Sequence, residues 1–169
     1  FEEAGVPAGV INVITTSTSS ATSGPLIADH RLRKITFTGS TTVGRKLIQQ
    51  ASERVLRTSM ELGGNAPFLV FEDADVDAAV AGAMLAKMRN IGQACTAANR
   101  FIVHESVAEE FGSKFAAKMG ELKLGRGVAE GTTCGPVINQ DAQDNMERLV
   151  AATISEGGNV LVGGESLEG

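Results

Sequence analysis

The sequence predicts an α/β fold with a largely parallel sheet. Short runs of β-branched and other apolar residues have the length of strands, and longer segments carry apolar residues at helical spacing. The two kinds of segment alternate throughout the 169 residues. Alternation of this kind is typical of βαβ units, in which successive strands pair in parallel.

Six runs bounded by glycine or other turn-forming residues indicate strands. They are residues 10–15, 33–37, 55–62, 66–71, 100–104 and 159–164. Five further segments indicate helices, because their apolar residues recur every three or four positions or because they follow a turn. They are residues 24–30, 44–52, 75–91, 106–122 and 140–156.

Two helix starts carry recognisable capping residues. Asp75 opens the third helix, and Asp73 and Asp77 add negative charge where the positive end of the helix dipole is expected. Ser106 and Glu109 have the spacing of a capping box, which places the start of the fourth helix at Ser106.

Composition excludes several classes of protein. The formal net charge is −5 and the chain has neither tryptophan nor tyrosine, so we expect no nucleic-acid partner. The apolar runs are too short to cross a bilayer, and we expect no membrane partner. Two cysteines are too few for a disulfide framework, which favours a cytoplasmic location. Both ends of the chain look cut, so we expect a segment of a longer protein.

The stretch "FTGSTTVG", residues 37–44, joins an expected strand to an expected helix. Backbone amides at such a helix start can bind an anion, and a phosphate is the natural ligand beside Gly39, Ser40 and Gly44. The alternative is a tight turn in which Ser40 or Thr41 caps the helix. Glycine spacing alone does not decide between the two.

A carboxylate stands at the end of an expected strand in "MELGGN", residues 60–65. Close to an apolar strand end, Glu61 is a candidate general base. Taken alone, it is better explained as a surface glutamate before a turn.

Cys95 lies in "MRNIGQACTAANR", residues 88–100, among small and polar neighbours rather than large apolar ones. A helix directed at it, a nearby arginine and backbone amides would favour the thiolate and stabilise an oxyanion, so Cys95 is a candidate nucleophile. The alternative is a small buried cysteine that fills a gap. We expect no metal site, because His30 and His104 are isolated and no second ligand has suitable spacing.

Three stretches, "FTGSTTVG", "ELGGNAP" and "GQACTAANR", in this order, resemble the aldehyde dehydrogenase superfamily. Glu61 and Cys95 are 95 − 61 = 34 positions apart, which agrees with the spacing of base and nucleophile in that family. "GVINVIT" and "GPVIN" extend the resemblance over essentially the whole chain. Within the superfamily, "KMRNIGQACTAANRF" is most similar to the succinate-semialdehyde dehydrogenases.

The resemblance implies NAD- or NADP-dependent oxidation of an aldehyde through a cysteine thiohemiacetal and thioester. Cys95 matches the nucleophile, and Glu61 matches the base that activates the hydrolytic water. The implied cofactor-binding residues are Gly39, Ser40 and Gly44 at the pyrophosphate, and Leu62 and Gly63 at the nicotinamide amide.

Arg89 stands six residues before Cys95, where succinate-semialdehyde dehydrogenases place a cation for the carboxylate of the substrate. A guanidinium can donate two hydrogen bonds to such a carboxylate. The alternative is that Arg89 caps the preceding helix. We expect Asn99 and Arg100 to support the loop rather than to touch substrate.

Succinate semialdehyde is the substrate that the resemblance favours. Three alternatives remain open at this point: another aldehyde, a cofactor-independent thioesterase that uses Cys95, and an inactive nucleotide-binding fragment.

The resemblance also implies two incomplete domains. Residues 1–91 match the second half of a Rossmann-like cofactor domain, and residues 92–169 match the first part of the catalytic domain that carries the nucleophile. We expect the parent protein to be a homodimer or homotetramer, and the segment alone to be inactive.

Overall fold

The computed structural model describes residues 1–166, which fall into two compact units. Unit 1 is Phe1–Leu62, and unit 2 begins at Gly63. Each unit contains one pair of parallel strands. The predicted α/β class with parallel strands is therefore confirmed.

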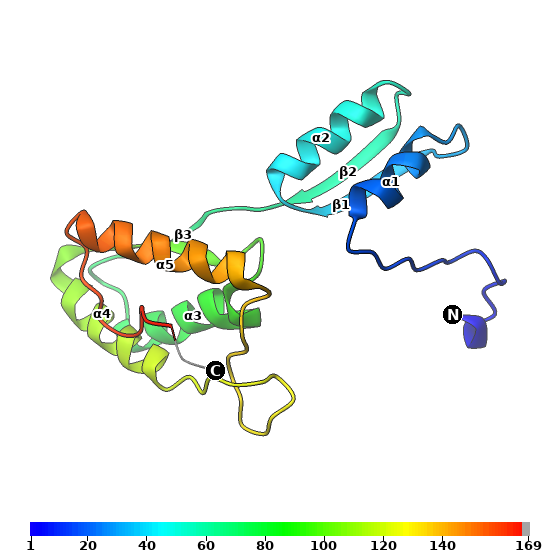
Figure 1. The fold of residues 1–169 in the computed structure, drawn as a ribbon. Helices are drawn as coiled ribbons and strands as arrows, with labels where there is room; N and C mark the ends of the chain where they lie inside the picture. The colour runs from blue at the N-terminus through cyan, green and yellow to red at the C-terminus, as the bar shows by residue number, and fades with distance from the viewer. Residues whose placement is uncertain (167–169) are drawn as a thin grey trace. The chain divides into compact units, whose positions relative to one another are not determined.

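Unit 1 is a parallel strand pair with a helix packed against it (Figure 1). β1, Lys34–Gly39, pairs along its whole length with β2, Arg57–Leu62. α2, Thr41–Ser52, connects the two strands. Small residues let α2 approach the strands closely, since Gly44 and Ala51 are the buried residues of this helix.

Before β1 the chain differs from the sequence prediction. Only the short helix η1, Glu2–Ala4, and α1, Ser19–Ala28, are formed there. The strand expected at residues 10–15 is wrong, because a β-branched run needs a neighbouring strand for its amides and carbonyls, and none of the described residues pairs with it. Helix α1 starts earlier than the expected residue 24, within the Ser/Thr-rich stretch.

Unit 2 contains a second parallel pair with helices packed on it (Figure 1). Its elements are β3 (Ala66–Val70), α3 (Val76–Met88), η2 (Arg89–Gly92), β4 (Ala98–Val103), α4 (Glu105–Gly120) and α5 (Gln140–Ser155). The pairing of β3 with β4 is irregular at one point, between Ala66 and Pro67, and regular beyond it.

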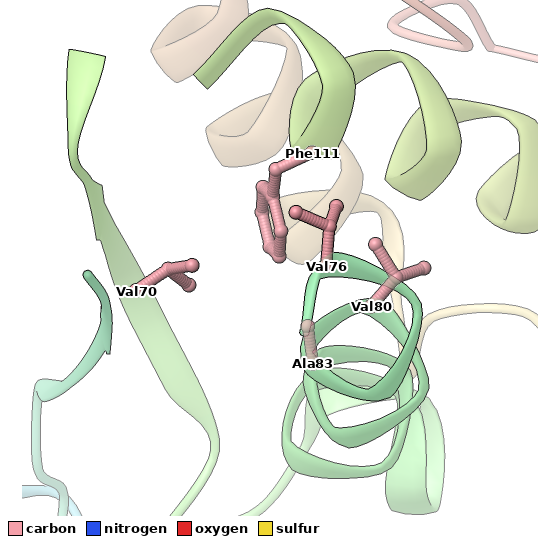
Figure 2. Packing of buried hydrophobic residues seen from close by; sticks show 5 residues of the cluster. All are labelled: Val70, Val76, Val80, Ala83 and Phe111. Carbon is pink, nitrogen blue, oxygen red and sulfur yellow. The ribbon is translucent and has the colours of Figure 1, made fainter. Parts of the chain in front are cut away.

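The core of unit 2 lies between β3, α3 and α4. Figure 2 shows the buried cluster that fills this space. Its members are Val70, Val76, Val80, Ala83 and Phe111. Phe101 on β4 extends the cluster through ring contacts with Phe68 at 5.5 Å and with Phe115 at 5.1 Å between ring centroids. Aromatic pairs at these distances add to the burial of their apolar surface. Both α3 and β4 are therefore anchored on a packed core.

The helix starts of unit 2 confirm one predicted cap and correct the other. Asp75 caps α3, since its carboxylate accepts a hydrogen bond from the Ala78 amide at 3.0 Å. The capping box at Ser106 is wrong, because α4 already begins at Glu105. The His104 ring takes the capping position there and accepts from the Ser106 amide at 3.3 Å.

The strand expected at residues 159–164 is also wrong. Gly163 and Gly164 have φ values of 67° and 85°, which are incompatible with an extended strand, and none of the described residues pairs with this run. Two further findings concern residues 1–166 only. They contain no helix that is long and apolar enough to cross a bilayer, and no group of three or more His, Cys, Asp or Glu placed to hold a metal ion. The last three residues of the expected 92–169 domain lie outside the described residues.

Candidate active site

The turn from Gly39 to Gly44, here called the Ser40 turn, joins the end of β1 to the start of α2. Ser40 caps the helix, and its hydroxyl accepts from the Val43 amide at 3.3 Å. The capping geometry that the sequence offered as an alternative is therefore present, with Ser40 as the cap. A capped first turn still leaves the amides of Thr41 and Thr42 directed out of the helix end, where an anion can accept from them.

Both glycines of the Ser40 turn lie where a side chain would collide with a neighbour. A methyl group at Gly39 would come within 2.5 Å of the Phe37 ring. One at Gly44 would lie 2.7 Å from the Leu62 Cδ2 atom, because α2 packs directly on the end of β2. Gly44 and Leu62 thus fix the distance between the helix start and the neighbouring strand end.

Glu61 lies at the same edge of the sheet as the Ser40 turn. In the parallel register Thr38 is opposite Glu61 and Gly39 is opposite Leu62, so both strands end at one edge. Ligands of parallel α/β sheets bind at this carboxyl edge. Glu61 is exposed and Leu62 is half-buried. The fold of unit 1 therefore places the candidate base and the candidate phosphate turn on one edge.

The candidate nucleophile lies on a turn of unit 2 between α3 and β4, residues 89–97, here called the Cys95 turn. Cys95 is exposed, which is not the environment of a cysteine that fills a gap in a core. The turn closes directly behind it, where the Ala97 amide donates to the Ala94 carbonyl at 3.0 Å. Ala97 and Ala98 are buried, so the chain enters β4 immediately after the thiol.

An unusual backbone conformation precedes Cys95. Asn90, Ile91 and Gly92 are consecutive residues with φ values of 53°, 51° and 80°. The left-handed region is costly for residues other than glycine, and most of all for a β-branched residue such as isoleucine. Asn90 offsets part of this cost, because its side-chain amide donates to the Gln93 carbonyl at 2.9 Å. The turn therefore depends on contacts with its surroundings.

One such contact comes from Gly64, in the segment Gly63–Gly64–Asn65 that precedes β3. A methyl group at Gly64 would lie 2.8 Å from the Cys95 carbonyl oxygen, so the two backbones are in close contact. Next to this contact, the Arg100 guanidinium donates to the Asn65 carbonyl at 3.1 Å. Gly63, the predicted nicotinamide contact, is exposed and has open space around its Cα.

Arg89 is exposed at the junction between α3 and η2. Its backbone amide closes α3 by donating to the Leu85 carbonyl, whereas its guanidinium makes no hydrogen bond within residues 1–166. The side chain lines a hollow of about 230 Å³ together with Ala94 and Thr96, the neighbours of Cys95 in the sequence. The Arg89 side chain is therefore exposed beside residues of the Cys95 turn.

In unit 1 the structure brings predicted residues together, since Gly39, Ser40, Gly44, Glu61 and Leu62 lie at one edge of the strand pair. In unit 2 the observed contacts are that of Gly64 with the Cys95 carbonyl and that of Arg89 with a hollow that Ala94 and Thr96 also line. The sequence alone gave no role to Gly64. Its Cα lies close to the Cys95 carbonyl, which is far away in the sequence, so this is a tertiary contact. The pair Gly63-Gly64 is the one feature of the sequence that could have indicated it.

Comparison with known proteins identifies the family. The family model described as the aldehyde dehydrogenase family matches residues 1–169. The chain belongs to the aldehyde dehydrogenase family. The predicted resemblance is confirmed, and the Rossmann-like character of the parallel strands agrees with that of the family's enzymes.

Characterised aldehyde dehydrogenases cover nearly all of this chain. It is 60% identical to a succinate-semialdehyde dehydrogenase of Paenarthrobacter nicotinovorans, over 99% of the chain and 37% of that protein. It is 48% identical to a 3-sulfolactaldehyde dehydrogenase of Pseudomonas putida, over 97% of the chain and 34% of that protein. A glutarate-semialdehyde dehydrogenase of Pseudomonas putida is 45% identical over 98% of the chain and 34% of its own length. The chain thus spans about a third of the length of these relatives.

Solved structures contain the same fold as this chain. An NADP-dependent enzyme of E. coli superposes with a TM-score of 0.93 at 44% identity, over 99% of this chain and 34% of that one. PnpE in complex with nicotinamide adenine dinucleotide superposes with a TM-score of 0.90 at 36% identity, again over 99% and 34% of the two chains.

Proposed function

We propose that the protein to which this chain belongs oxidises an aldehyde to a carboxylic acid, with NAD or NADP as electron acceptor. The observation that carries the proposal is the exposed thiol of Cys95 on a turn that tertiary contacts hold, in a chain that matches the aldehyde dehydrogenase family from end to end. The fragment alone lacks about two thirds of the length of its relatives, and we propose that it is inactive by itself.

The Ser40 turn is the proposed binding site for the cofactor pyrophosphate. Two amides at the start of α2 and the Ser40 hydroxyl suit phosphate oxygens, and the dipole of α2 favours negative charge there. Leu62 and Gly63, at and just beyond the same strand edge, are the proposed neighbours of the nicotinamide amide. One relative is named for NADP and one solved structure holds NAD, which supports this class of cofactor without choosing between the two.

Cys95 and Glu61 are the proposed catalytic residues. The Cys95 thiolate bonds to the carbonyl carbon of the aldehyde, and after oxidation the acyl group remains on the sulfur as a thioester. The bound nicotinamide supplies the acceptor for the two electrons. Glu61 then takes a proton from water, the hydroxide attacks the thioester, and the acid leaves as the thiol is restored.

Arg89 is the proposed recognition residue for the substrate. The relatives are named for succinate semialdehyde, glutarate semialdehyde and 3-sulfolactaldehyde. Each of these aldehydes carries an anionic group at the end opposite the aldehyde. A guanidinium that lines the same hollow as the neighbours of Cys95 is suited to such an anion. Succinate semialdehyde is the proposed substrate, because the relative named for it shares 60% identity.

The remaining assignments follow the family. Residues 1–91 are the proposed second half of the cofactor domain, and residues 92–169 are the proposed start of the catalytic domain. The parent protein is proposed to be a cytoplasmic homodimer or homotetramer.

Kinetics of the full-length protein test these roles. We expect NADH or NADPH to form in step with succinate, and Cys95→Ser to abolish both; acid formation without cofactor reduction would favour a thioesterase instead.

Arg89→Met should raise KM for succinate semialdehyde at least tenfold and leave KM for butanal, an aldehyde of equal length without the carboxylate, within threefold. Equal losses on both substrates would refute the role of Arg89.

A further inference from the structure

A hydrogen-bonded junction beside the Cys95 turn joins three parts of unit 2 that are distant in the sequence. Lys87 comes from the last turn of α3, Asn99 from the start of β4, and Gly64 from the segment before β3. The Lys87 ammonium donates to the Asn99 Oδ1 atom at 2.9 Å, and the Asn99 Nδ2 atom donates to the Gly64 carbonyl at 3.4 Å.

The chemistry of the two neighbours fixes the orientation of the Asn99 amide. An ammonium can only donate, and a backbone carbonyl can only accept. The Asn99 oxygen must therefore face Lys87 and its NH₂ group must face Gly64. Aspartate and leucine have nearly the size of asparagine. Neither can both accept from Lys87 and donate to the Gly64 carbonyl, so each is a suitable substitution to test the junction.

Gly64 links this junction to the candidate nucleophile. Its Cα lies so close to the Cys95 carbonyl that an added methyl group would come within 2.8 Å of the oxygen. The Cys95 turn itself contains three left-handed residues, so its local conformational preference does not hold it in place. Contacts from outside the turn must therefore add to its own hydrogen bonds, and the Gly64 backbone makes such a contact directly with Cys95.

We propose that Asn99 is a positioning residue, which acts through Gly64 to hold the Gly63–Gly64–Asn65 segment against Cys95, with Lys87 orienting its amide. The inference rests on the proposed function for its effect on turnover, and on the structure alone for its effect on the thiol. Asn99 touches neither substrate nor cofactor in this role.

Asn99 could matter because it holds Gly64 or only because it pairs with Lys87. Two variants of the full-length protein distinguish these roles. Asn99→Asp keeps an acceptor for Lys87, now as an ion pair, but turns a carboxylate oxygen toward the Gly64 carbonyl, which repels it. Lys87→Met removes the ammonium and keeps the donor to Gly64. The matched control is Asn145→Asp on α5, where the amide oxygen also accepts from a cation, Arg148, at 2.8 Å.

We expect Asn99→Asp to lower kcat at least tenfold while KM for succinate semialdehyde stays within threefold and the melting temperature stays within a few degrees. Lys87→Met should lower kcat less than threefold, and Asn145→Asp should leave it unchanged. A wild-type kcat for Asn99→Asp, or an equal loss in Lys87→Met, would overturn the inference.

A second measurement does not depend on catalysis. Asn99→Leu removes both hydrogen bonds without adding charge, and alkylation by iodoacetamide reports on each thiol by peptide mass analysis. Release of the Cys95 turn should change the conformations in which the thiol meets the reagent. We expect the alkylation rate of Cys95, relative to that of Cys134 in the same sample, to change at least threefold. An unchanged ratio would refute the positioning role even if the protein proved to have no dehydrogenase activity, and a changed ratio without activity would refute only the proposed function.

Discussion

The Ser40 turn and the Cys95 turn both present candidate functional groups just outside a strand, yet they are held in different ways. The cap of the Ser40 turn is local, because the residue after β1 accepts a hydrogen bond from an amide three positions further on. The Cys95 turn runs through three left-handed residues and contacts a segment about thirty positions earlier in the sequence. A substitution in the first turn should therefore change one helix end, whereas one in the second should move the nucleophile.

The largest effect is expected for Gly64→Ala. The new methyl group would lie 2.8 Å from the Cys95 carbonyl oxygen, and backbone on both sides has to shift to make room. We expect a loss of about 1–3 kcal/mol in the free energy of unfolding. A displaced nucleophile should also lower kcat roughly a hundredfold. Urea unfolding and steady-state kinetics of the full-length protein measure both. Gly127→Ala is the control, since no atom lies within 4 Å of the added methyl group there.

Asn90→Ala should have the next largest effect. It removes the hydrogen bond to the Gln93 carbonyl and places alanine at a φ of 53°. The two losses together should lower the free energy of unfolding by about 1–2 kcal/mol. Asn90→Gly loses the same hydrogen bond but tolerates the left-handed backbone, so we expect it to be the more stable of the two in urea unfolding. The opposite order would show that backbone conformation does not limit the Cys95 turn.

Ser40 variants test the local character of the first turn. Ser40→Ala removes the cap of α2 and should cost about 1 kcal/mol. Ser40→Asp restores a cap and a favourable interaction with the helix dipole, so stability should return. If the turn also binds the cofactor pyrophosphate, the added negative charge should raise KM for NAD or NADP at least tenfold. Stability regained with an unchanged KM would leave Ser40 only its capping role.

Gly44→Ala should have the smallest effect, although its geometry resembles that of Gly64→Ala. The added methyl group would lie 2.7 Å from a terminal methyl of Leu62, a side chain that can move, rather than from backbone. Alanine also gains about 1 kcal/mol in helix propensity over glycine, which offsets the crowding. We expect the free energy of unfolding to change by less than about 1 kcal/mol. A loss as large as that of Gly64→Ala would show that both turns are equally rigid.

The sequence by itself determined the class of fold, most of the helices and strands, the cap at Asp75 and the candidate residues Cys95, Glu61 and Ser40. These features depend on local periodicity, capping preferences and short motifs, all of which can be read along the chain. The runs at residues 10–15 and 159–164 failed as strands because a strand is decided by its partner, and none of the described residues pairs with them.

Only the tertiary structure revealed how the Cys95 turn is held. The contact of Gly64 with the Cys95 carbonyl and the hydrogen bond from Asn99 to the Gly64 carbonyl join segments that are 95 − 64 = 31 and 99 − 64 = 35 positions apart, and no local preference encodes them. Asn90 and Ile91 oppose their intrinsic preference before Cys95, so their conformation depends on the local Asn90–Gln93 hydrogen bond and on the packing around them. The chain thus carries the chemical groups in its sequence, while long-range contacts decide where the thiol is presented.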